Sequence, residues 1–446
     1  MLSAIEKAVN SFIEKTANKH VKIISHFDTD GITSATILAK ALKRMNKSFS
    51  TRILKSLDIE TIKSLQKKEV LVFLDLGSSF LQELSSFENV FVIDHHEISG
   101  EVPANLIVIN PHLFDKQSIS SAGLTYLFAK QLDAQNKDSA SLAVVGMVGD
   151  MLDRDISKLN NLIINDAEVA IKKGLLLYPS TRPIHKTLEF SSSTFIPGVT
   201  GNPRGACELL REAGIERVNG EFKNLIELTE EESSRLITAI LLRRMKQKSG
   251  FSGKGSLDII GSIYLIKMFN KLEDARELSA MINACSRLGS PEVALLLCLG
   301  NKNARKKAEE IYASYKQHII AALNYVSTTQ DKIEGKGYVI INAKENIKDT
   351  MAGTIASILS VSSIHEEGTV IITMANSDEK IKVSARIAGR NGRNLREVLE
   401  QVTSKIGGET GGHALAAGCM INKENEHVFL DYLKKVLEIE TIKVGD

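Results

Sequence analysis

The first 165 residues of the chain alternate compact apolar runs with stretches of helical periodicity. Each run is rich in β-branched residues and is followed by polar or turn residues, whereas 32–45 and 124–132 place their apolar residues at helical spacing. Strands that alternate with helices form a parallel sheet with crossover helices. We therefore expect an α/β domain with a parallel sheet over residues 18–165. Its predicted strands are 21–25, 70–74, 90–93 and 106–109.

The pattern of apolar residues changes in the middle of the chain. From 171 to 330 helical periodicity dominates and β-branched runs are few. Thr229 and Glu232 have the spacing of a capping box at the start of a helix over 234–245. This stretch predicts a mostly helical middle domain.

Strand-like runs return from residue 337. They alternate with helical patterns at 350–360 and 395–404, so they predict a second, smaller α/β domain over 337–440. We expect a cleft between the two α/β domains. The predicted strands of the second domain are 338–341, 369–374 and 381–385.

Composition and charge narrow the class of protein. Hydrophobic residues make up 43% of the chain and charged residues 25%, as in ordinary globular proteins, and the net charge is +2. The 4 cysteines lie far apart without a C-x-x-C pair, which favours reduced thiols in a cytosolic protein over disulfides or a zinc site. The sequence has no signal-peptide core and no run of about 18 apolar residues. We expect a cytoplasmic protein without a membrane partner.

A cluster of potential metal ligands follows the first predicted strand. His26, Asp28 and Asp30 alternate at i, i+2 and i+4, a spacing that points side chains to one side of an extended backbone. Gly31 lets the chain turn sharply into the next helix. Ligands of parallel sheets bind beyond the carboxyl ends of the strands. Carboxylates that converge there would repel one another without a cation.

Acidic and imidazole side chains also close three later apolar stretches. Asp75 ends the second strong run, Asp94-His95-His96 ends the next, and Asp150 closes an apolar helical stretch. A single aspartate after a strand usually caps a helix or forms a turn, and two adjacent histidines are uninformative by themselves. Four such clusters together are better explained by a shared metal site. Carboxylate and imidazole donors without thiolate favour Mn²⁺ or Mg²⁺, and two such ions can stabilise an in-line displacement at phosphorus.

These four clusters resemble the signature motifs of the DHH phosphoesterase superfamily in order and spacing. Near the C-terminus, GGHALAAG at 411–418 is similar to the G-G-H-x-x-A-A-G motif of the DHH-associated domain. That domain partners the catalytic domain in RecJ and in small-oligonucleotide phosphodiesterases. The two resemblances cover most of the chain outside the middle domain.

The resemblance implies two metal ions, Mn²⁺ or Mg²⁺, in each active site. One ion would be held by His26, Asp28 and Asp75. The other would be held by Asp30, Asp75, His95 and Asp150, with Asp75 bridging the two ions.

The resemblance also implies which groups act on the substrate. His96 would face the substrate and steady the scissile phosphate or the leaving oxygen. Asp94 would orient an imidazole from behind the ligands. With the bridging Asp75, these are the expected catalytic residues.

In the DHH-associated domain, the resemblance implies phosphate-binding groups. Arg386 matches the substrate-binding arginine of the family, Gly411 and Gly412 permit close approach of a phosphate, and His413 would contact a nucleotide phosphate. The segment 381–405 is locally basic, which beside this motif favours a phosphate-binding surface over an ordinary solvated helix face. Its basic residues are Lys382, Arg386, Arg390, Arg393, Arg396 and Lys405.

We expect a RecJ-like exonuclease that hydrolyses single-stranded DNA or RNA by a two-metal mechanism, with a link to DNA repair or replication. The sequence ends at Asp446, without room for the oligonucleotide-binding barrel of the bacterial enzymes, so it resembles the shorter archaeal RecJ-like proteins. Aromatic residues that could stack on bases are few, and Tyr264, Phe251 and Phe269 are candidates.

Two other functions fit the same motifs. One is a phosphodiesterase for short oligonucleotides or a cyclic dinucleotide, although the extra helical mass of the middle domain favours a longer strand path or a partner surface. The other is a replisome scaffold. The DHH-like subunit of the eukaryotic replicative helicase shows that the fold can serve this role, and archaeal relatives resemble proteins that bind the GINS complex. A scaffold would be expected to have lost some carboxylates, whereas all four motifs are occupied here.

Overall fold

The computed structural model describes residues 1–446 except 115, 192–195, 247–258, 363–364, 390 and 439–446. The chain forms two compact units, each built from two separate segments. Unit 1 comprises Met1–Thr181 and Ile260–Ala313, and unit 2 comprises Arg182–Ile259 and Ser314–Asp446. Within the described residues, no helix combines the length and the apolar character needed to cross a membrane.

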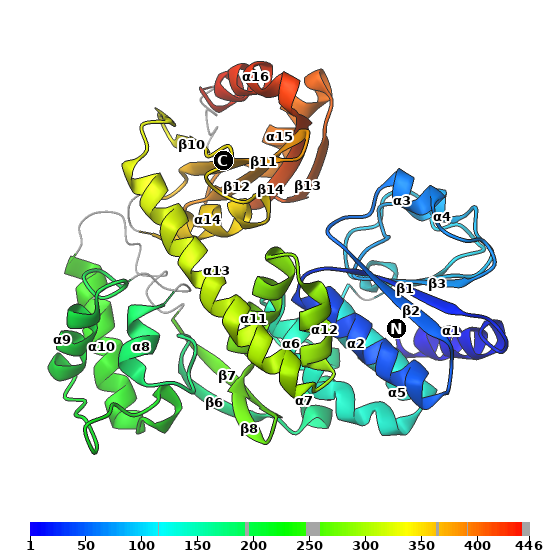
Figure 1. Ribbon diagram of the computed structural model, residues 1–446, viewed down its shortest axis with the longest axis horizontal. Coiled ribbons are helices and arrows are strands. Elements are labelled where there is room, and N and C mark those ends of the chain that lie inside the picture. The colour runs from blue at the N-terminus through cyan, green and yellow to red at the C-terminus, as the bar shows by residue number, and fades with distance from the viewer. Residues whose placement is uncertain (115, 192–195, 247–258, 363–364, 390, 439–446) are drawn as a thin grey trace, which may run out of the picture. The chain divides into compact units, whose positions relative to one another are not determined.

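A five-stranded parallel sheet forms the centre of unit 1 (Figure 1). The four strands predicted from the sequence are present. The fifth strand, β2, lies at the edge of the sheet. Its residues are partly or fully exposed and include polar ones, so β2 lacks the continuous apolar run of a central strand. In sheet order the strands are β2 (Phe49–Leu54), β1 (Val21–His26), β3 (Val70–Leu74), β4 (Val90–Ile93) and β5 (Ile107–Ile109).

The helix α2 (Thr29–Arg44) is almost wholly buried. It packs against helices from both segments of unit 1, including α5, α6 and α12 (Figure 1). The amphipathic α1 buries Phe12 between Phe91 and Phe128, with ring centroids 5.1 and 5.3 Å away. The other helices of unit 1 are α1 (Leu2–Lys15), α3 (Ile59–Lys63), α4 (Leu81–Leu84), α5 (Ser121–Leu132), α6 (Ala140–Gly149), α7 (Lys158–Ala167), α11 (Ala275–Arg287) and α12 (Pro291–Cys298).

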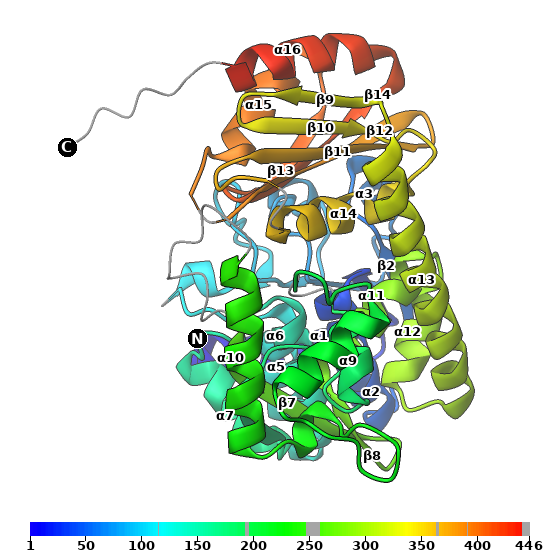
Figure 2. The same cartoon turned by 90° about the vertical axis from the view of Figure 1, so that its left-hand side faces the viewer.

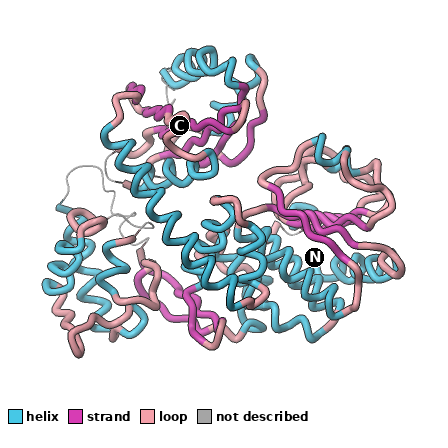
Figure 3. Tube along the Cα trace, viewed as in Figure 1, coloured by secondary structure: helices cyan, strands magenta, loops and turns pink. Residues whose placement is uncertain are grey.

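A small antiparallel sheet joins the two segments of unit 1. Its strands are β6 (Ala170–Leu175), β7 (Ile260–Met268) and β8 (Lys271–Asp274), in the order β6-β7-β8 (Figure 3). The helical prediction for 171–330 missed these strands. β6 is largely exposed and β8 has only 4 residues, and the prediction also missed the buried apolar run of β7.

The rest of the middle stretch is helical, as predicted. It contains α8 (Ile184–Glu189), α9 (Pro203–Glu212), α10 (Glu230–Lys246) and the long α13 (Lys302–Thr328). The capping box of α10 is present: the Thr229 amide donates to Glu232 Oε2 at 2.9 Å, and the Glu232 amide donates to Thr229 Oγ1 at 3.1 Å.

The C-terminal part of unit 2 is a six-stranded mixed sheet with helices on both faces (Figure 2). The helix α14 (Asp349–Val361) packs on β11 and β12, whereas α15 (Leu395–Ile406) and α16 (Glu426–Glu438) cover the main apolar core on the other face. The predicted α/β fold class is thus confirmed for both ends of the chain. In sheet order the strands are β13 (Glu409–His413), β14 (Ala416–Asn422), β12 (Lys380–Ile387), β11 (Val370–Ser377), β10 (Tyr338–Asn342) and β9 (Lys332–Gly335).

Gly146 lies where α6 crosses α2 and α5 at close range. A Cβ at this position would lie 2.5 Å from Ala122 Cβ and 2.5 Å from Asp30 Oδ1. We expect Gly146→Ala to lower the free energy of unfolding by about 1–3 kcal/mol, the usual range for an overpacked core. Thermal or urea unfolding measures the change.

Gly353→Ala in α14 is the matched control. Its added Cβ would meet nothing closer than 3.4 Å, and removing a glycine from a helix stabilises by up to about 1 kcal/mol. Equal destabilisation by both variants would contradict the packing argument.

Candidate metal centre

The parallel register of the central sheet brings three ligand-bearing strand ends together. Ser25 is paired with Leu74, and Leu74 with Ile93. Therefore the residues that follow, His26, Asp75 and Asp94, lie at the same edge of the sheet.

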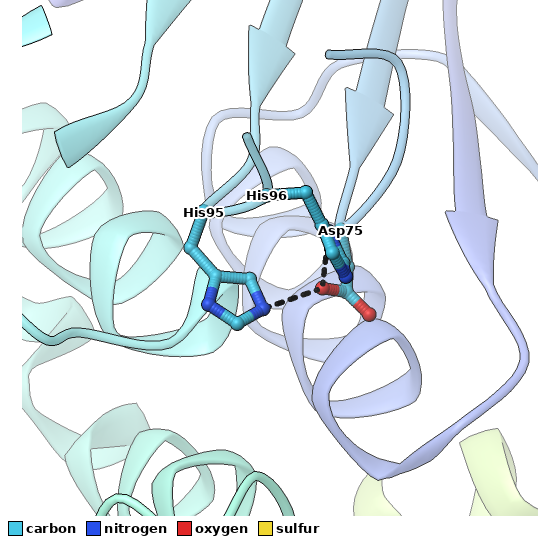
Figure 4. Close-up of side chains that lie close together, drawn as sticks. All are labelled: Asp75, His95 and His96. Atoms are coloured by element: carbon cyan, nitrogen blue, oxygen red, sulfur yellow. Dashed lines mark ion pairs between the residues drawn. The ribbon is translucent and has the colours of Figure 1, made fainter. Parts of the chain in front are cut away.

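Asp75 leaves its strand in the left-handed region, with φ of 59°. This conformation is uncommon for residues other than glycine, and it occurs often at functional sites. Figure 4 shows the Asp75 carboxylate directed at the imidazoles of His95 and His96.

The N-terminus of α2 holds two further carboxylates. Asp28 caps the helix, accepting a hydrogen bond from the Gly31 amide at 3.0 Å. Gly31 has no room for a side chain, because a Cβ would lie 2.2 Å from the His26 carbonyl oxygen. Asp30 is fully buried and accepts hydrogen bonds from the amides of Ser121 and Ala122, at 2.6 and 3.0 Å. These amides begin α5, so the positive end of that helix stabilises the Asp30 carboxylate.

Asp150 follows the last turn of α6 and completes the cluster. Its Oδ2 lies 3.2 Å from His95 Nε2. That oxygen is buried, yet it accepts no hydrogen bond from any residue in the described ranges. A buried carboxylate oxygen without a donor is expensive unless a cation binds it.

The side chains form three overlapping groups whose donor atoms lie within 4.8 Å of one another. Each oxygen of Asp75 faces a different group: Oδ2 lies 3.2 Å from His26 Nδ1, and Oδ1 lies 3.5 Å from His95 Nε2. The groups are His26, Asp28 and Asp75; Asp30, His95 and Asp150; and Asp75, His95 and His96.

Asp94 organises the loop that carries the two histidines. Its carboxylate accepts hydrogen bonds from the amides of Ser78, His95 and His96, at 3.1, 2.8 and 3.2 Å. It also lies 2.7 Å from His96 Nδ1. This contact leaves the Nε2 side of the half-exposed His96 ring directed away from Asp94.

One residue outside the predicted site, Asn110, holds this loop on the side away from the ligands. Asn110 is fully buried, and its Nδ2 donates to the His96 carbonyl at 2.8 Å and to Ser78 Oγ at 3.0 Å. Its Oδ1 accepts from the His112 amide at 2.9 Å, capping a short 3₁₀ turn, Pro111–Leu113. An Asn-Pro pair is typical of a turn, so the sequence at Asn110 gives no sign of the contact to His96.

Burial and mutual repulsion separate the carboxylates into two classes. Burial, together with the charges of Asp28 and Asp30, raises the pKa of Asp75 well above its usual range. Burial and the charges of Asp30 and Asp75 do the same to the pKa of Asp150. In contrast, the pKa of Asp94 is lowered. Burial alone would raise this pKa, but the hydrogen bond with His96 helps to lower it.

The imidazoles respond to the same field. Burial is the largest single effect on His26 and lowers its pKa, but the neighbouring carboxylates, first Asp28 and then Asp150 and Asp94, together outweigh burial and raise that pKa. For His96, burial again lowers the pKa, but the hydrogen bond and the charge of Asp94, helped by the charge of Asp28, together raise it above its usual value. The site is therefore an anionic pocket of oxygen and imidazole donors without thiolate, which fits hard divalent cations.

The substrate-binding residues expected in the second α/β domain lie on one row of the unit 2 sheet. Arg386 of β12 and His413 of β13 are both paired with Ala416 of β14, so both lie on the face that α14 partly covers. Arg386 Nε donates to Ser357 Oγ of α14 at 2.9 Å, whereas His413 is exposed.

The two glycines before His413 have different roles. Gly412 has φ of 115°, and a Cβ there would lie 2.5 Å from the Ala416 carbonyl oxygen. The β13–β14 pairing itself thus requires this glycine. A Cβ at Gly411 would meet nothing within 4 Å, so its exposed backbone is open to a ligand.

The prediction of one basic surface over 381–405 is wrong in part. Lys382 and Arg386 share a face of β12, but α15 lies on the opposite face of the sheet. There Arg396 pairs with Glu400 at 2.8 Å, and Lys405 lies 4.9 Å from the centre of the Tyr432 ring. Arg390 lies outside the described residues.

The candidate stacking residues also divide. Tyr264 is buried at 3% exposure, so its ring is covered by protein and cannot stack on a base. Arg305 lies over the Phe269 ring at 5.8 Å. Phe251 falls outside the residues that the structure describes.

Comparison with protein families identifies the class of protein. The N-terminal domain of the DHH family matches residues 20–148, the DHH-CID domain matches 177–254, and the DHHA1 domain matches 335–439. Together these matches cover more than two thirds of the chain. The chain therefore belongs to the DHH family and carries its DHHA1 domain.

A relative in Methanocaldococcus jannaschii, an uncharacterized protein, is 29% identical over 460 residues, with 98% of both chains covered. The predicted likeness to archaeal proteins agrees with this match.

Solved structures share the fold of the whole chain. RecJ of Thermus thermophilus in complex with Mn²⁺ matches with a TM-score of 0.61 at 18% identity, covering 98% of this chain and 55% of RecJ, so the chain spans about half of that protein. An exonuclease RecJ bound to manganese matches with a TM-score of 0.60 at 16% identity, over 98% and 95% of the two chains. CDC45 of Entamoeba histolytica matches with a TM-score of 0.66 at 12% identity, over 98% and 99%. These likenesses establish a DHH phosphoesterase fold.

Bound cations should stabilise this protein, since they neutralise a repulsive cluster in the folded state only. At a free Mn²⁺ concentration of 100 times the Kd, the gain is about 2.7 kcal/mol. We expect Mn²⁺ to raise the Tm of the wild type, as measured by calorimetry. In EDTA we expect Asp75→Asn to be more stable than the wild type, because it removes a buried charge that its neighbours repel.

Asp138→Asn serves as the control. Asp138 lies at the surface of unit 1 and pairs with Arg44 at 2.6 Å. This variant should keep the full response to Mn²⁺ and gain no stability in EDTA. If neither Mn²⁺ nor Mg²⁺ raised the Tm of the wild type, the assignment of a metal centre would be wrong.

Proposed function

We propose that this protein is a metal-dependent phosphodiesterase that degrades single-stranded DNA or RNA as an exonuclease. The observation that carries the proposal is the position of Asp75. Its two oxygens face two separate donor groups, one with His26 and one with His95. A shared carboxylate of this kind suits a pair of divalent cations, Mn²⁺ or Mg²⁺.

His26 and Asp28 would complete the first cation site with Asp75. Asp30, His95 and Asp150 would complete the second. Two cations held in this way would supply charge stabilisation for an in-line displacement at phosphorus and would lower the pKa of a bound water that attacks. RecJ structures solved with Mn²⁺ share the fold and support this choice of cation.

His96 would act on the substrate from the same loop. Its Nδ1 is engaged by Asp94 at 2.7 Å, and its raised pKa favours the charged imidazolium. In that form Nε2–H can donate a hydrogen bond to a phosphate oxygen of the scissile bond. Asp94 fixes the orientation of the ring, and Asn110 fixes the backbone beneath it.

In unit 2, Arg386 and His413 would bind phosphates of the nucleic acid. Both lie on one row of the sheet, and the exposed backbone at Gly411 leaves space for a phosphate beside them. Such contacts are independent of base sequence, as degradation of a strand requires.

Product analysis tests the proposal directly. A long single strand labelled at either end should be shortened to mononucleotides in Mn²⁺, and EDTA should stop the reaction. Asp75→Asn should lose more than about 100-fold in rate, beyond the usual effect of losing an outer partner of a metal ligand. Activity that survives exhaustive chelation would refute the metal-dependent mechanism, and cleavage of dinucleotides alone would favour a short-oligonucleotide phosphodiesterase.

The residues of unit 2 should affect substrate binding. Losing a hydrogen bond to a charged phosphate costs about 1.5–3 kcal/mol, so His413→Ala should raise KM about tenfold while Mn²⁺ affinity is unchanged. Arg386→Lys should restore little of the loss caused by Arg386→Ala, because lysine lacks the two-pronged guanidinium. Steady-state kinetics and Mn²⁺ titration calorimetry measure the two properties.

His427→Ala is the matched control in unit 2. His427 is exposed on α16 and lies 3.1 Å from Asp431. It should leave KM unchanged. If His413→Ala weakened Mn²⁺ binding and left KM at the wild-type value, the assignment of a phosphate contact would be wrong.

A second candidate is a replisome subunit that binds the GINS complex. CDC45 shares the fold over almost the full length of both chains, which favours it. The complete set of metal-site residues argues for catalysis instead. Co-purification with GINS by Asp75→Asn, together with absence of nuclease activity in the wild type, would favour the scaffold.

A further inference from the structure

The helix α11 lies outside every family match and yet contacts the metal centre. The matched residues end at 148, resume at 177, end again at 254 and resume at 335. Within unit 1, α11 (Ala275–Arg287) packs against both α2 and α6. These are the two helices whose ends carry Asp28, Asp30 and Asp150, so α11 is in a position to fix one set of ligands relative to the other.

The contacts converge on Thr29, the residue between Asp28 and Asp30. The Thr29 amide donates to Asn283 Oδ1 at 3.0 Å. The Thr29 hydroxyl donates to the Ser279 carbonyl at 3.0 Å and lies 3.0 Å from Ser279 Oγ. Thr29 is 1% exposed, so water cannot replace these partners.

The amide of Thr29 needs a partner from outside its helix. The first amides of an α-helix have no acceptor within the helix. Asp28 accepts from Gly31 and not from Thr29. Without Asn283, the buried Thr29 amide would lose its acceptor. Any movement of Thr29 toward a new acceptor would carry Asp28 and Asp30 with it.

The other side of this contact is Gly149, which precedes Asp150. A Cβ at Gly149 would lie 2.9 Å from Thr29 Cβ and 3.3 Å from Ser279 Oγ. The end of α6, the start of α2 and the middle of α11 therefore meet without space for one more methyl group. A shift of Thr29 would also change the distance between Asp30 and Asp150.

We propose that Asn283 is a positioning residue of the metal centre, which sets cation affinity by holding the Asp28–Asp30 loop against the end of α6. The inference rests on the proposed function, because it assigns Asn283 to the same two-cation site. It adds to that function a determinant more than 250 residues from the ligands that it positions.

Titration of Mn²⁺ into the metal-free full-length protein tests the inference. Asn283→Leu keeps the approximate volume and removes the acceptor. It should weaken Mn²⁺ binding by about 10- to 100-fold, the range found when an outer partner of a metal ligand is lost. Asn283→Asp keeps an acceptor for the Thr29 amide, so it should bind Mn²⁺ at least as tightly as the wild type.

Asn301→Ala is the matched control in the same unit. Asn301 also accepts hydrogen bonds from helix amides, those of Asn303 and Ala304, but it caps α13. It should lower the Tm in EDTA and leave Mn²⁺ affinity unchanged. In kinetics at limiting Mn²⁺, Asn283→Leu should recover most of its kcat when Mn²⁺ is raised, and KM for the strand should stay constant.

The outcomes separate the inference from the proposed function. If the wild type binds Mn²⁺ and Asn283→Leu binds it equally well, the positioning role is wrong and the proposed function stands. If Asn283→Asp is as weak as Asn283→Leu, the hydrogen bond is not the cause and the inference is also wrong. If the wild type itself binds no Mn²⁺, both are wrong. Should Asn283→Leu not fold, Ser279→Ala removes only the hydroxyl contact and should give a smaller loss of affinity in the same assay.

Discussion

Asp30, Asp75 and Asp94 are almost wholly buried within one cluster of carboxylates, and burying an ionised carboxylate without compensation is among the most expensive events in folding. The fold compensates two of them itself. Asp30 receives the first amides of α5, and Asp94 receives three loop amides. Asp75 and Asp150 have fewer donors, and theirs are the carboxyl groups whose pKa rises far above the usual range. The uncompensated charge is thus concentrated on Asp75 and Asp150, which both contact His95.

This concentration requires helices that approach one another more closely than side chains normally allow. Glycine makes that approach possible at Gly146, where a Cβ would meet Asp30, and at Gly149, where it would meet Thr29. Both lie on α6, whose next residue is Asp150. The packing of α6 on α2 consequently determines the geometry of the ligands that these two helices carry. A change in the packing of α6 on α2 therefore also changes the positions of the ligands.

Part of this arrangement can be predicted from the sequence. The apolar runs at 70–74 and 90–93 identify buried parallel strands, and the residues that follow them are placed correctly because parallel strands end at one edge of a sheet. Edge strands such as β2 and β6 are missed, since half-exposed residues weaken the apolar signal. The opposite orientation of Lys382 and Arg396 is missed for a different reason: local charge counts carry no information about which face of a sheet a later helix covers.

The residues that position the ligands are the least predictable part of the site, because they contact residues far away in the sequence. Thr29 and Asn283 are 254 residues apart, and Asn110 reaches His96 through a side chain that looks like a turn former. Between Thr29 and Asn283 in the sequence, the chain leaves unit 1 after Thr181 and returns to it at Ile260, and β6 pairs with β7 on either side of this segment. The entropic free-energy cost of closing a loop rises slowly with its length, by only about 0.6 kcal/mol for each doubling. The segment 182–259 can therefore vary in length at little energetic cost, provided that β7 and α11 keep their positions in unit 1. This physical separation would let residues 182–259 change in length and sequence while the ligand geometry, set by α2, α6 and α11, stays the same.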